Sequence, residues 1–170
     1  MSASWVARPE ERRDIPVVRA IEMAAFSTPA EADLVDALRD SPAWIQGLSY
    51  VAERDGLVAA HALLTRCHIG GVPALALAPC AVLPAHQRQG AGTAAIEGAL
   101  AAARDLGESL VLVLGHPSYY PRFGFVPASL YGVRAPFDVP DEAMMALVLD
   151  DSGRVPGGTI AYPAPFGVLV

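Results

Sequence analysis

A short polar and glycine-rich stretch, HQRQGAGTAA at residues 86–95, interrupts a chain that is 53% hydrophobic. Its glycines, Gly90 and Gly92, stand directly before an alanine-rich run with strong helix-forming composition. Glycine lets a backbone approach a ligand closely, and the first N–H groups of a helix have no carbonyl partner within that helix. The stretch therefore predicts a turn that opens a helix and binds an anion through its backbone.

Two other interpretations of this stretch stay open on spacing alone. One is a solvated loop followed by a helix that packs closely on a sheet. The other is dinucleotide binding, because GAGTAA at 90–95 fits the G-x-G-x-x-G/A pattern. Polar residues separate the preceding strand from Gly90, and the next predicted strand ends in LGHP without an acidic residue for a ribose hydroxyl. Both features count against a dinucleotide.

Hydrophobic periodicity predicts the helices that surround the turn. The first helix is expected over 14–26 with Asp14 as N-cap, and the second over 28–40 with Thr28 as N-cap and Glu31 three residues later. A third helix is expected over about 90–106, where Gly107 would stop it.

The strands follow from apolar runs and turn residues. A hairpin is expected around Arg54-Asp55-Gly56, and the strand over 72–84 should carry a bulge or an edge at Pro79. Further strands are expected over 109–115 and 142–151, with a helical turn or loop between them and strand-like residues at 157–170. This order predicts a mixed α/β (α+β) sheet with helices on both faces, built as a single domain over residues 1–170.

Composition excludes several classes of protein. A net charge of −6 and a pI near 5.1 argue against nucleic-acid binding, and all twelve basic residues are arginine, which excludes a Schiff-base or P-loop lysine. The uncharged run at 69–85 contains three prolines and is read as strands, so no membrane association is expected. Two cysteines and no visible signal peptide predict a cytoplasmic protein. Cys67 and His68 alone are too few ligands to predict a metal site.

Two motifs resemble the GCN5-related N-acetyltransferase (GNAT) superfamily. The run QRQGAG at 87–92, after a strand that ends near a proline, is similar to the acetyl-CoA signature Q/R-x-x-G-x-G/A. YYPRFGF at 119–125 is similar to the family's Tyr-x-x-x-Gly-Phe element and puts Tyr120 in the tyrosine position. The longer match, strongest from about residue 79 to 149, resembles the bacterial YhbS-like group of predicted N-acetyltransferases.

The resemblance implies a GNAT-like fold in which two parallel strands splay apart and acetyl-CoA enters the opening between them. Here that opening would lie between residues 79–84 and 110–116. Backbone groups of the first strand would bond the pantetheine amides, and the glycine turn would hold the pyrophosphate. The implied cofactor-binding residues are Ala81, Val82, Leu83, Gln87, Arg88, Gln89, Gly90, Ala91, Gly92, Thr93 and Ser118.

The resemblance also implies transfer of the acetyl group to a primary amine, directly in a ternary complex without a metal. Tyr120 would protonate the departing thiolate; the alternative is that it only anchors an aromatic cluster. The base stays open between Glu22, His61 and a water relay, and Phe26 is a further candidate on the acceptor side. Cys80 is interpreted as structural rather than nucleophilic.

The acceptor is expected to be a small-molecule or peptide amine, and a homodimer is left open. A competing hypothesis is a non-catalytic acyl-CoA-binding sensor or scaffold on the same fold, since fold alone does not fix function. The glycine turn fits both hypotheses, whereas Tyr120 is needed only by an enzyme.

Overall fold

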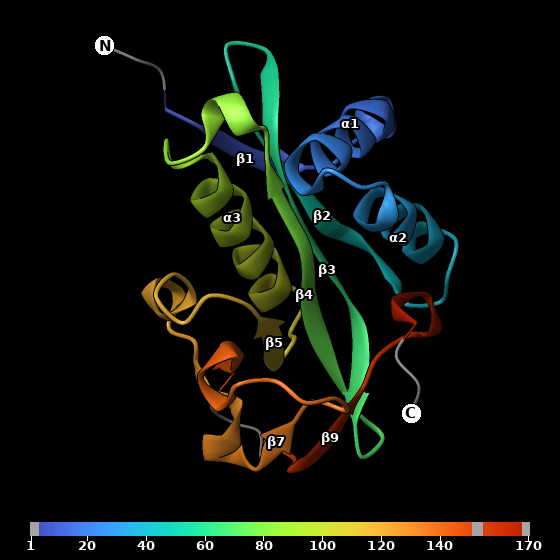
Figure 1. Cartoon of the computed structure of the whole chain (residues 1–170), viewed down its shortest axis with the longest axis vertical. Coiled ribbons are helices and arrows are strands. Elements are labelled where there is room, and N and C mark those ends of the chain that lie inside the picture. The colour runs from blue at the N-terminus through green and yellow to red at the C-terminus, as the bar shows by residue number, and fades with distance from the viewer. Residues whose placement is uncertain (1–3, 151–154, 168–170) are drawn as a thin grey trace.

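A mixed sheet forms the centre of the computed structural model, which describes residues 4–150 and 155–167 (Figure 1). Its main path has the strand order β1-β2-β3-β4-β5-β8-β6, and β9 joins β3 and β7. The strands are β1 (Val6–Pro9), β2 (Trp44–Arg54), β3 (Leu57–Ile69), β4 (Val72–Val82), β5 (Leu110–Leu114), β6 (Val126–Pro127), β7 (Val133–Arg134), β8 (Met144–Val148) and β9 (Gly158–Ala161).

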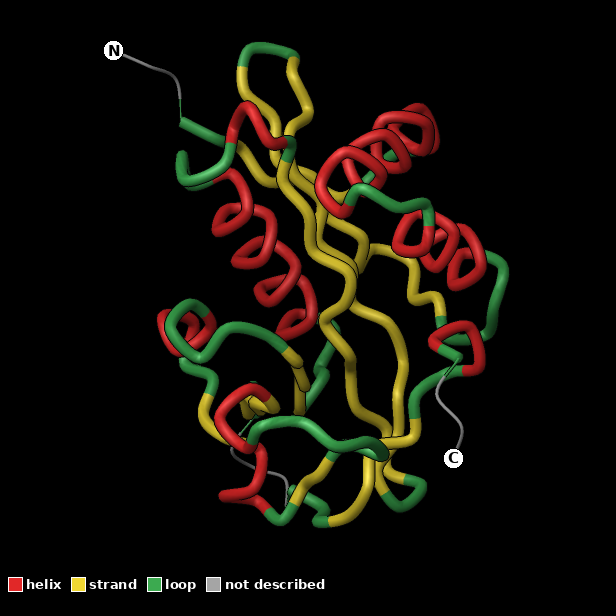
Figure 2. Tube along the Cα trace, in the orientation of Figure 1, coloured by secondary structure: helices red, strands yellow, loops and turns green. Residues whose placement is uncertain are grey.

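Helices cover both faces of this sheet, as the sequence predicts (Figures 1 and 2). The helices are α1 (Ile15–Phe26), α2 (Ala30–Arg39) and α3 (Ala91–Asp105). The amphipathic helices α1 and α2 bury one stripe each against one face of β2 and β3. The alanine-rich α3 packs on the opposite face, where its small side chains allow close approach. At Gly98 even a Cβ atom would lie 2.7 Å from Tyr50 Cδ2, so this approach requires glycine.

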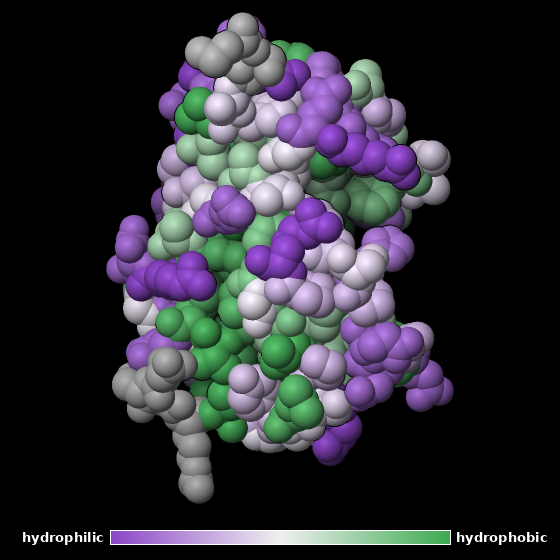
Figure 3. Space-filling model, turned by 90° about the vertical axis from the view of Figure 1, so that its left-hand side faces the viewer, coloured by the Kyte–Doolittle hydropathy of each residue, from purple (hydrophilic) through white to green (hydrophobic). Residues whose placement is uncertain are grey.

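The C-terminal part of the chain closes the lower end of the sheet. β9 pairs with the end of β3 at His68–Ala161 and Ile69–Ile160, and β7 lies beside β9 (Figure 1). A separate apolar cluster, which includes Ile160 and Met144, fills this end. The side of the molecule that carries α3 has its apolar side chains concentrated in the lower half, and polar ones dominate above (Figure 3).

The parallel pair β4 and β5 separates soon after it forms. The two strands pair at Leu75–Val111 and Ala76–Leu112, after which β4 continues to Val82 while β5 ends at Leu114. β4 stays paired with β3 along its length, with a bulge at Ala78–Pro79 that the proline predicted. We call the opening between β4 beyond Ala76 and β5 beyond Leu112 the wedge. It confirms the expected splayed parallel pair.

Several elements differ from the sequence-based expectation. Three short strands, β1, β6 and β7, were not predicted, because none of them has an alternating pattern of apolar and polar residues. The Asp14 carboxylate makes no capping bond to α1; it accepts two hydrogen bonds from Arg8 and one from the Glu11 N–H. α2 begins at Ala30 with Pro29 before it, and the Thr28 hydroxyl bonds the Glu31 carboxylate instead of the backbone.

The last two predicted strands are also shorter than expected. The strand predicted over 142–151 covers only Met144–Val148, and its final position lies outside the described residues. The segment 157–170 forms β9 and then a 3-10 turn (Ala164–Phe166), because two prolines without N–H groups end the pairing. Residues 168–170 lie outside the described part. None of the described helices is long and apolar enough to cross a membrane.

Candidate functional site

A pocket of about 570 Å³ occupies the wedge, between β4, the start of α3 and the segment after β5. The far end of α1 closes one side of it. Elements distant in the sequence therefore contribute to one lining, which consists of Ala25, Phe26, Cys80, Ala81, Val82, Gln87, Arg88, Gly92, Ile96, His116, Ser118, Tyr119, Tyr120 and Arg122. We call this space the wedge pocket.

The glycine-rich turn stands at the entrance of the wedge pocket and begins α3. Gly90 is the N-cap residue with φ +90°, a conformation that favours glycine, and Arg88 also has a positive φ of 64°. A Cβ atom on Gly92 would lie 2.9 Å from Val82 Cγ2, so the helix start and β4 meet there without room for a side chain. The turn therefore presents the first N–H groups of α3, at the positive end of the helix dipole, to this pocket.

The backbone of β4 offers one hydrogen-bonding edge to the wedge. The Leu83 N–H donates to the Ala59 carbonyl of β3, and the Leu83 carbonyl accepts from the His86 N–H. Since successive residues of a strand direct their N–H groups to opposite edges, the Val82 N–H points away from β3 and into the wedge. Of the three residues expected to bond a pantetheine chain, Val82 is thus the one with its N–H on that side.

Tyr120 lines the wedge pocket, and its phenol lies close enough to the Cys80 thiol for each group to influence the pKa of the other. Burial raises the pKa of Tyr120, and the nearby Cys80 and Tyr119 raise it further. Its ring packs edge-on against Phe125, with the ring centroids 5.9 Å apart, and covers Gly115, where a Cβ atom would lie 2.3 Å from the ring. The phenol is therefore protonated and fixed in orientation, as a proton donor requires.

Tyr119 also lines the wedge pocket but has different partners. Its hydroxyl lies 2.9 Å from Thr93 Oγ1 in the first turn of α3, and the Arg122 guanidinium stacks over its ring at 4.2 Å. Burial raises the pKa of Tyr119 as well. Tyr119 thus connects α3 to the segment after β5, whereas Tyr120 faces the sulfur atom of Cys80.

Cys80 is half-buried in the wall of the wedge pocket, and desolvation of its thiol together with the charge of Glu22 raises its pKa to about 12. A thiol of this kind holds little thiolate near neutral pH. This agrees with the interpretation of Cys80 as structural.

Glu22 and His61 form a buried hydrogen-bonded chain with Ser49. Glu22 Oε1 lies 2.8 Å from His61 Nδ1, and His61 Nε2 lies 2.8 Å from Ser49 Oγ. Burial raises the pKa of Glu22, although the contact with His61 opposes this shift. The second carboxylate oxygen, Oε2, is buried and makes no hydrogen bond to the described residues.

The hydrogen-bonded network of Glu22, His61 and Ser49 lies directly behind the wedge pocket. Glu22 is one helical turn before Ala25 and Phe26, which line the pocket. His61 pairs across the sheet with Ala81, another lining residue. The two residues that the sequence offered as separate candidates for a base are therefore partners in one network.

The structure brings most of the predicted site together and leaves some of it outside the pocket lining. The predicted residues that are not among the lining residues are Leu83, Gln89, Gly90, Ala91 and Thr93, together with Glu22 and His61, which lie behind the wall. Gln89 accepts a hydrogen bond from Arg54, and Thr93 holds Tyr119. Three lining residues were missed by the sequence analysis: Ala25, Ile96 and Arg122. Three more were not assigned to the site: Cys80, His116 and Tyr119. Their proximity in sequence to Ser118 and Tyr120 could have indicated His116 and Tyr119.

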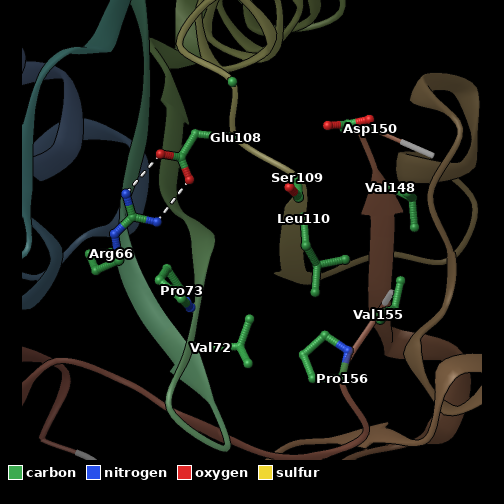
Figure 4. Close-up of a pocket in the computed structure, with 11 residues that line it drawn as sticks. Arg66, Val72, Pro73, Glu108, Ser109, Leu110, Val148, Asp150, Val155 and Pro156 are labelled. Atoms are coloured by element: carbon green, nitrogen blue, oxygen red, sulfur yellow. Dashed lines mark hydrogen bonds and ion pairs between the residues drawn. The ribbon is translucent and has the colours of Figure 1, made fainter. Parts of the chain in front are cut away.

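A second hollow, of about 470 Å³, lies at the opposite ends of β4 and β5 (Figure 4). Its charged lining residues are Arg66, Glu108 and Asp150, and Arg66 donates two hydrogen bonds of 2.8 Å to the Glu108 carboxylate. The rest of the wall is largely apolar, with Val72, Leu110 and Pro156 pointing toward the hollow (Figure 4). We call it the closed-end hollow.

Among the described residues, no group of three or more His, Cys, Asp or Glu side chains could hold a metal ion.

Comparison with known proteins agrees with this geometry. The model of the acetyltransferase (GNAT) family matches residues 15–125. The uncharacterized N-acetyltransferase YjhQ of Escherichia coli (strain K12) is 37% identical over 137 residues, which cover 78% of this chain and 76% of YjhQ.

Two solved structures are similar over nearly the whole chain. One is the GNAT family N-acetyltransferase YhbS from Escherichia coli in complex with CoA, with a TM-score of 0.88, 26% identity and coverage of 98% of this chain and 95% of that chain. The other is a GNAT family acetyltransferase from Brucella melitensis in complex with acetyl-CoA, with a TM-score of 0.77, 32% identity and coverage of 96% and 98%. Together with the splayed β4–β5 pair and the glycine turn before α3, these matches show that the chain belongs to the GNAT family and is an acyltransferase.

Proposed function

We propose that this protein transfers an acetyl group from acetyl-CoA to a primary amine, directly and within a ternary complex. The observation that carries the proposal is the wedge pocket, where an unpaired strand edge, a helix N-terminus and a protonated phenol surround one space. The CoA and acetyl-CoA complexes of the two similar structures support the choice of donor.

The donor would lie along β4 with its pyrophosphate at the start of α3. The N–H groups from Arg88 to Thr93 are suited to phosphate oxygens because the helix dipole adds positive potential there. Gln87 and Arg88 line the same end and add a polar and a charged group, while Ser118 lines the wall after β5. The Val82 N–H would bond the pantetheine arm or the carbonyl oxygen as negative charge develops on it.

In the transfer step the amine nitrogen attacks the thioester carbonyl carbon and forms the C–N bond. The C–S bond then breaks, and Tyr120 gives its phenolic proton to the departing sulfur. Solvent returns a proton to Tyr120 after the products leave. Tyr120 suits this role because its phenol stays protonated and already faces a sulfur atom, that of Cys80.

The proton lost by the amine would pass to Glu22, which shares a hydrogen bond with His61. A carboxylate with a raised pKa accepts a proton near neutral pH more readily than an ordinary one. Because Glu22 is buried, a bridging water would have to carry the proton across the wall formed by Ala25 and Phe26. Phe26 is 38% exposed at this wall and would face the acceptor.

The experiment that tests the function combines binding and turnover. Calorimetry with acetyl-CoA should show binding at one site per chain, and thiol release from acetyl-CoA should rise when a suitable primary amine is added. Binding without turnover across a broad amine panel would instead favour the acyl-CoA-binding module. Absence of both would contradict the proposed function.

A further inference from the structure

A smaller cavity of about 190 Å³ opens at the base of the wedge. Its floor includes Ala76 and Leu112, the last paired residues of β4 and β5. These side chains belong to the apolar cluster at the C-terminal end, while their neighbours Leu75 and Val111 pack against α3. The cavity therefore lies on the face of the sheet opposite α3, and we call it the basal cavity.

The basal cavity adjoins the wedge pocket along β4. Ala78 lines the basal cavity and Cys80 lines the wedge pocket. Two residues along a strand correspond to at most about 7 Å, and the bulge at Ala78–Pro79 lies within this interval, so a small molecule can have one group in each space. An amine whose nitrogen reaches the thioester carbon could therefore place its substituent in the basal cavity.

Three aromatic side chains from two separate segments form the outer wall of the basal cavity. Phe137 stacks on Tyr162 with 6.1 Å between centroids and 22° between planes, and the ring centroids of Tyr162 and Phe166 are 5.3 Å apart. Phe137 is 36% exposed and Leu114 is 44% exposed, so apolar surface remains open to solvent here. None of the described residues that line the cavity is charged.

The polar side-chain group on this wall is the Tyr162 phenol. Its O–H donates to Met144 Sδ at 4.0 Å, a weak acceptor. Burial raises the pKa of Tyr162 to about 12, so the group is neutral near pH 7. The wall thus combines flat apolar surfaces with a single neutral donor.

We propose that the basal cavity receives one uncharged ring of the acceptor, joined by one or two carbon atoms to the primary amine that is acetylated. A cavity of about 150 Å³ lined by apolar side chains binds benzene, so the basal cavity has room for a single ring. A polycationic acceptor would bring charge against a wall without a charged partner, at a large desolvation cost. The inference rests on the proposed acetyl transfer and specifies its acceptor.

Matched amines test this inference directly. Thiol release from acetyl-CoA is measured with 2-phenylethylamine, n-propylamine and spermidine under the same conditions. We expect kcat/KM to be about 10- to 100-fold higher for 2-phenylethylamine than for n-propylamine, the range expected when one ring is buried. Equal or better use of n-propylamine or spermidine would overturn the inference.

Variants then locate the effect. Phe137→Ala should lower kcat/KM for 2-phenylethylamine about 10-fold while leaving the value for n-propylamine and the affinity for acetyl-CoA unchanged. Tyr131→Ala is a matched control, because Tyr131 is 37% exposed and does not line the basal cavity. If Phe137→Ala changes both amines equally, or changes only the melting temperature, the aromatic wall is structural and the inference fails.

Direct binding separates this inference from the proposed function. NMR titration of 2-phenylethylamine into the protein, with and without CoA, reports on the basal cavity without any turnover. Ring binding that Phe137→Ala abolishes supports the inference even if acetyl-CoA is not a substrate. Absence of ring binding overturns it even if acetyl-CoA binds and other amines are acetylated.

Discussion

The same two strands, β4 and β5, border hollows of opposite character at their two ends. In the closed-end hollow the charged groups of Arg66 and Glu108 satisfy each other through two hydrogen bonds (Figure 4). In the wedge pocket the backbone edge of β4 and the first N–H groups of α3 are available to a ligand, and the Tyr120 phenol lies beside the Cys80 thiol.

This difference in the pairing of polar groups indicates that the wedge pocket, and not the closed-end hollow, is suited to binding a ligand. In the closed-end hollow the pair of Arg66 and Glu108 helps to hold β3 to the segment before β5. The wedge pocket instead keeps polar groups available beside glycines that leave space. The two hollows differ little in volume, about 570 and 470 Å³, so the polar groups available to a ligand distinguish them better than size does.

The largest expected effect is at the open end, from Tyr120→Phe. This change keeps the ring against Phe125 and removes the hydroxyl, so kcat should fall about 10²- to 10⁴-fold while acetyl-CoA affinity stays nearly constant. Steady-state kinetics and calorimetry measure the two quantities. Tyr119→Phe is the control, since its hydroxyl bonds Thr93. A normal Tyr120→Phe enzyme beside an inactive Tyr119→Phe enzyme would reverse the assignment.

The next effect concerns binding at the same end. Gly92→Val would place side-chain atoms where even a Cβ lies 2.9 Å from Val82 Cγ2, and would crowd the start of α3. Loss of one or two charge-assisted hydrogen bonds, about 2 kcal/mol, would weaken acetyl-CoA binding roughly 30-fold. Ala101→Val, on the exposed side of α3, controls for the lower helix propensity of valine. Equal affinities of the two variants for acetyl-CoA would contradict a role of the glycine turn in binding.

At the closed end the expected effect is on stability alone. Glu108→Gln weakens the pair with Arg66 and should lower the free energy of unfolding by about 1–2 kcal/mol, as measured by urea titration. Turnover and acetyl-CoA affinity should not change. Glu142→Gln, at an exposed glutamate, should leave stability within about 0.5 kcal/mol of the parent. A loss of activity in Glu108→Gln would contradict the assignment of a purely structural role to the closed-end hollow.

The smallest effect expected is an alkaline limit of activity displaced to higher pH. The ordinary pKa of tyrosine is about 10. Because burial raises the pKa of Tyr120, the phenol remains protonated beyond the pH at which a free tyrosine ionises. The pH profile of kcat should therefore show no decline assignable to Tyr120 up to about pH 10. A decline with an apparent pKa near 9 that Tyr120→Phe abolishes would contradict this environment.

Local sequence signals predicted the main elements of the fold. Gly90 and Gly107 bracket α3, and Asp55-Gly56 forms the hairpin turn between β2 and β3. Pro79 predicted a bulge or an edge, because proline has no N–H to donate within a paired strand, and the structure shows the bulge. β1 was missed because its four residues lack alternation and depend on pairing with β2. Asp14 does occupy the N-cap position of α1, as predicted, but its carboxylate bonds Arg8, a partner that depends on the position of β1.

The candidate site also has one part that local sequence signals predict and another part that depends on tertiary packing. The glycine turn and Tyr120 each lie within a contiguous motif, so the sequence could indicate them. The pairing of Glu22 with His61 joins residues 39 apart, and it depends on how α1 lies across β3. The contact of Tyr120 with Cys80 likewise depends on the wedge. Such contacts follow from packing and register, which no local pattern encodes.

The unpaired edge of β4 has a consequence for self-association. A strand edge with open N–H and C=O groups is a template on which strands of other molecules can add, and proteins usually cover or blunt such edges. Here the edge lies inside the sheet, between the start of α3 on one side and the tyrosines after β5 on the other. A foreign β-strand would have to fit side chains on both of its faces between these elements, whereas a thin amide chain without side chains would not. We therefore expect this edge to resist strand addition by other molecules even though it is open along part of β4.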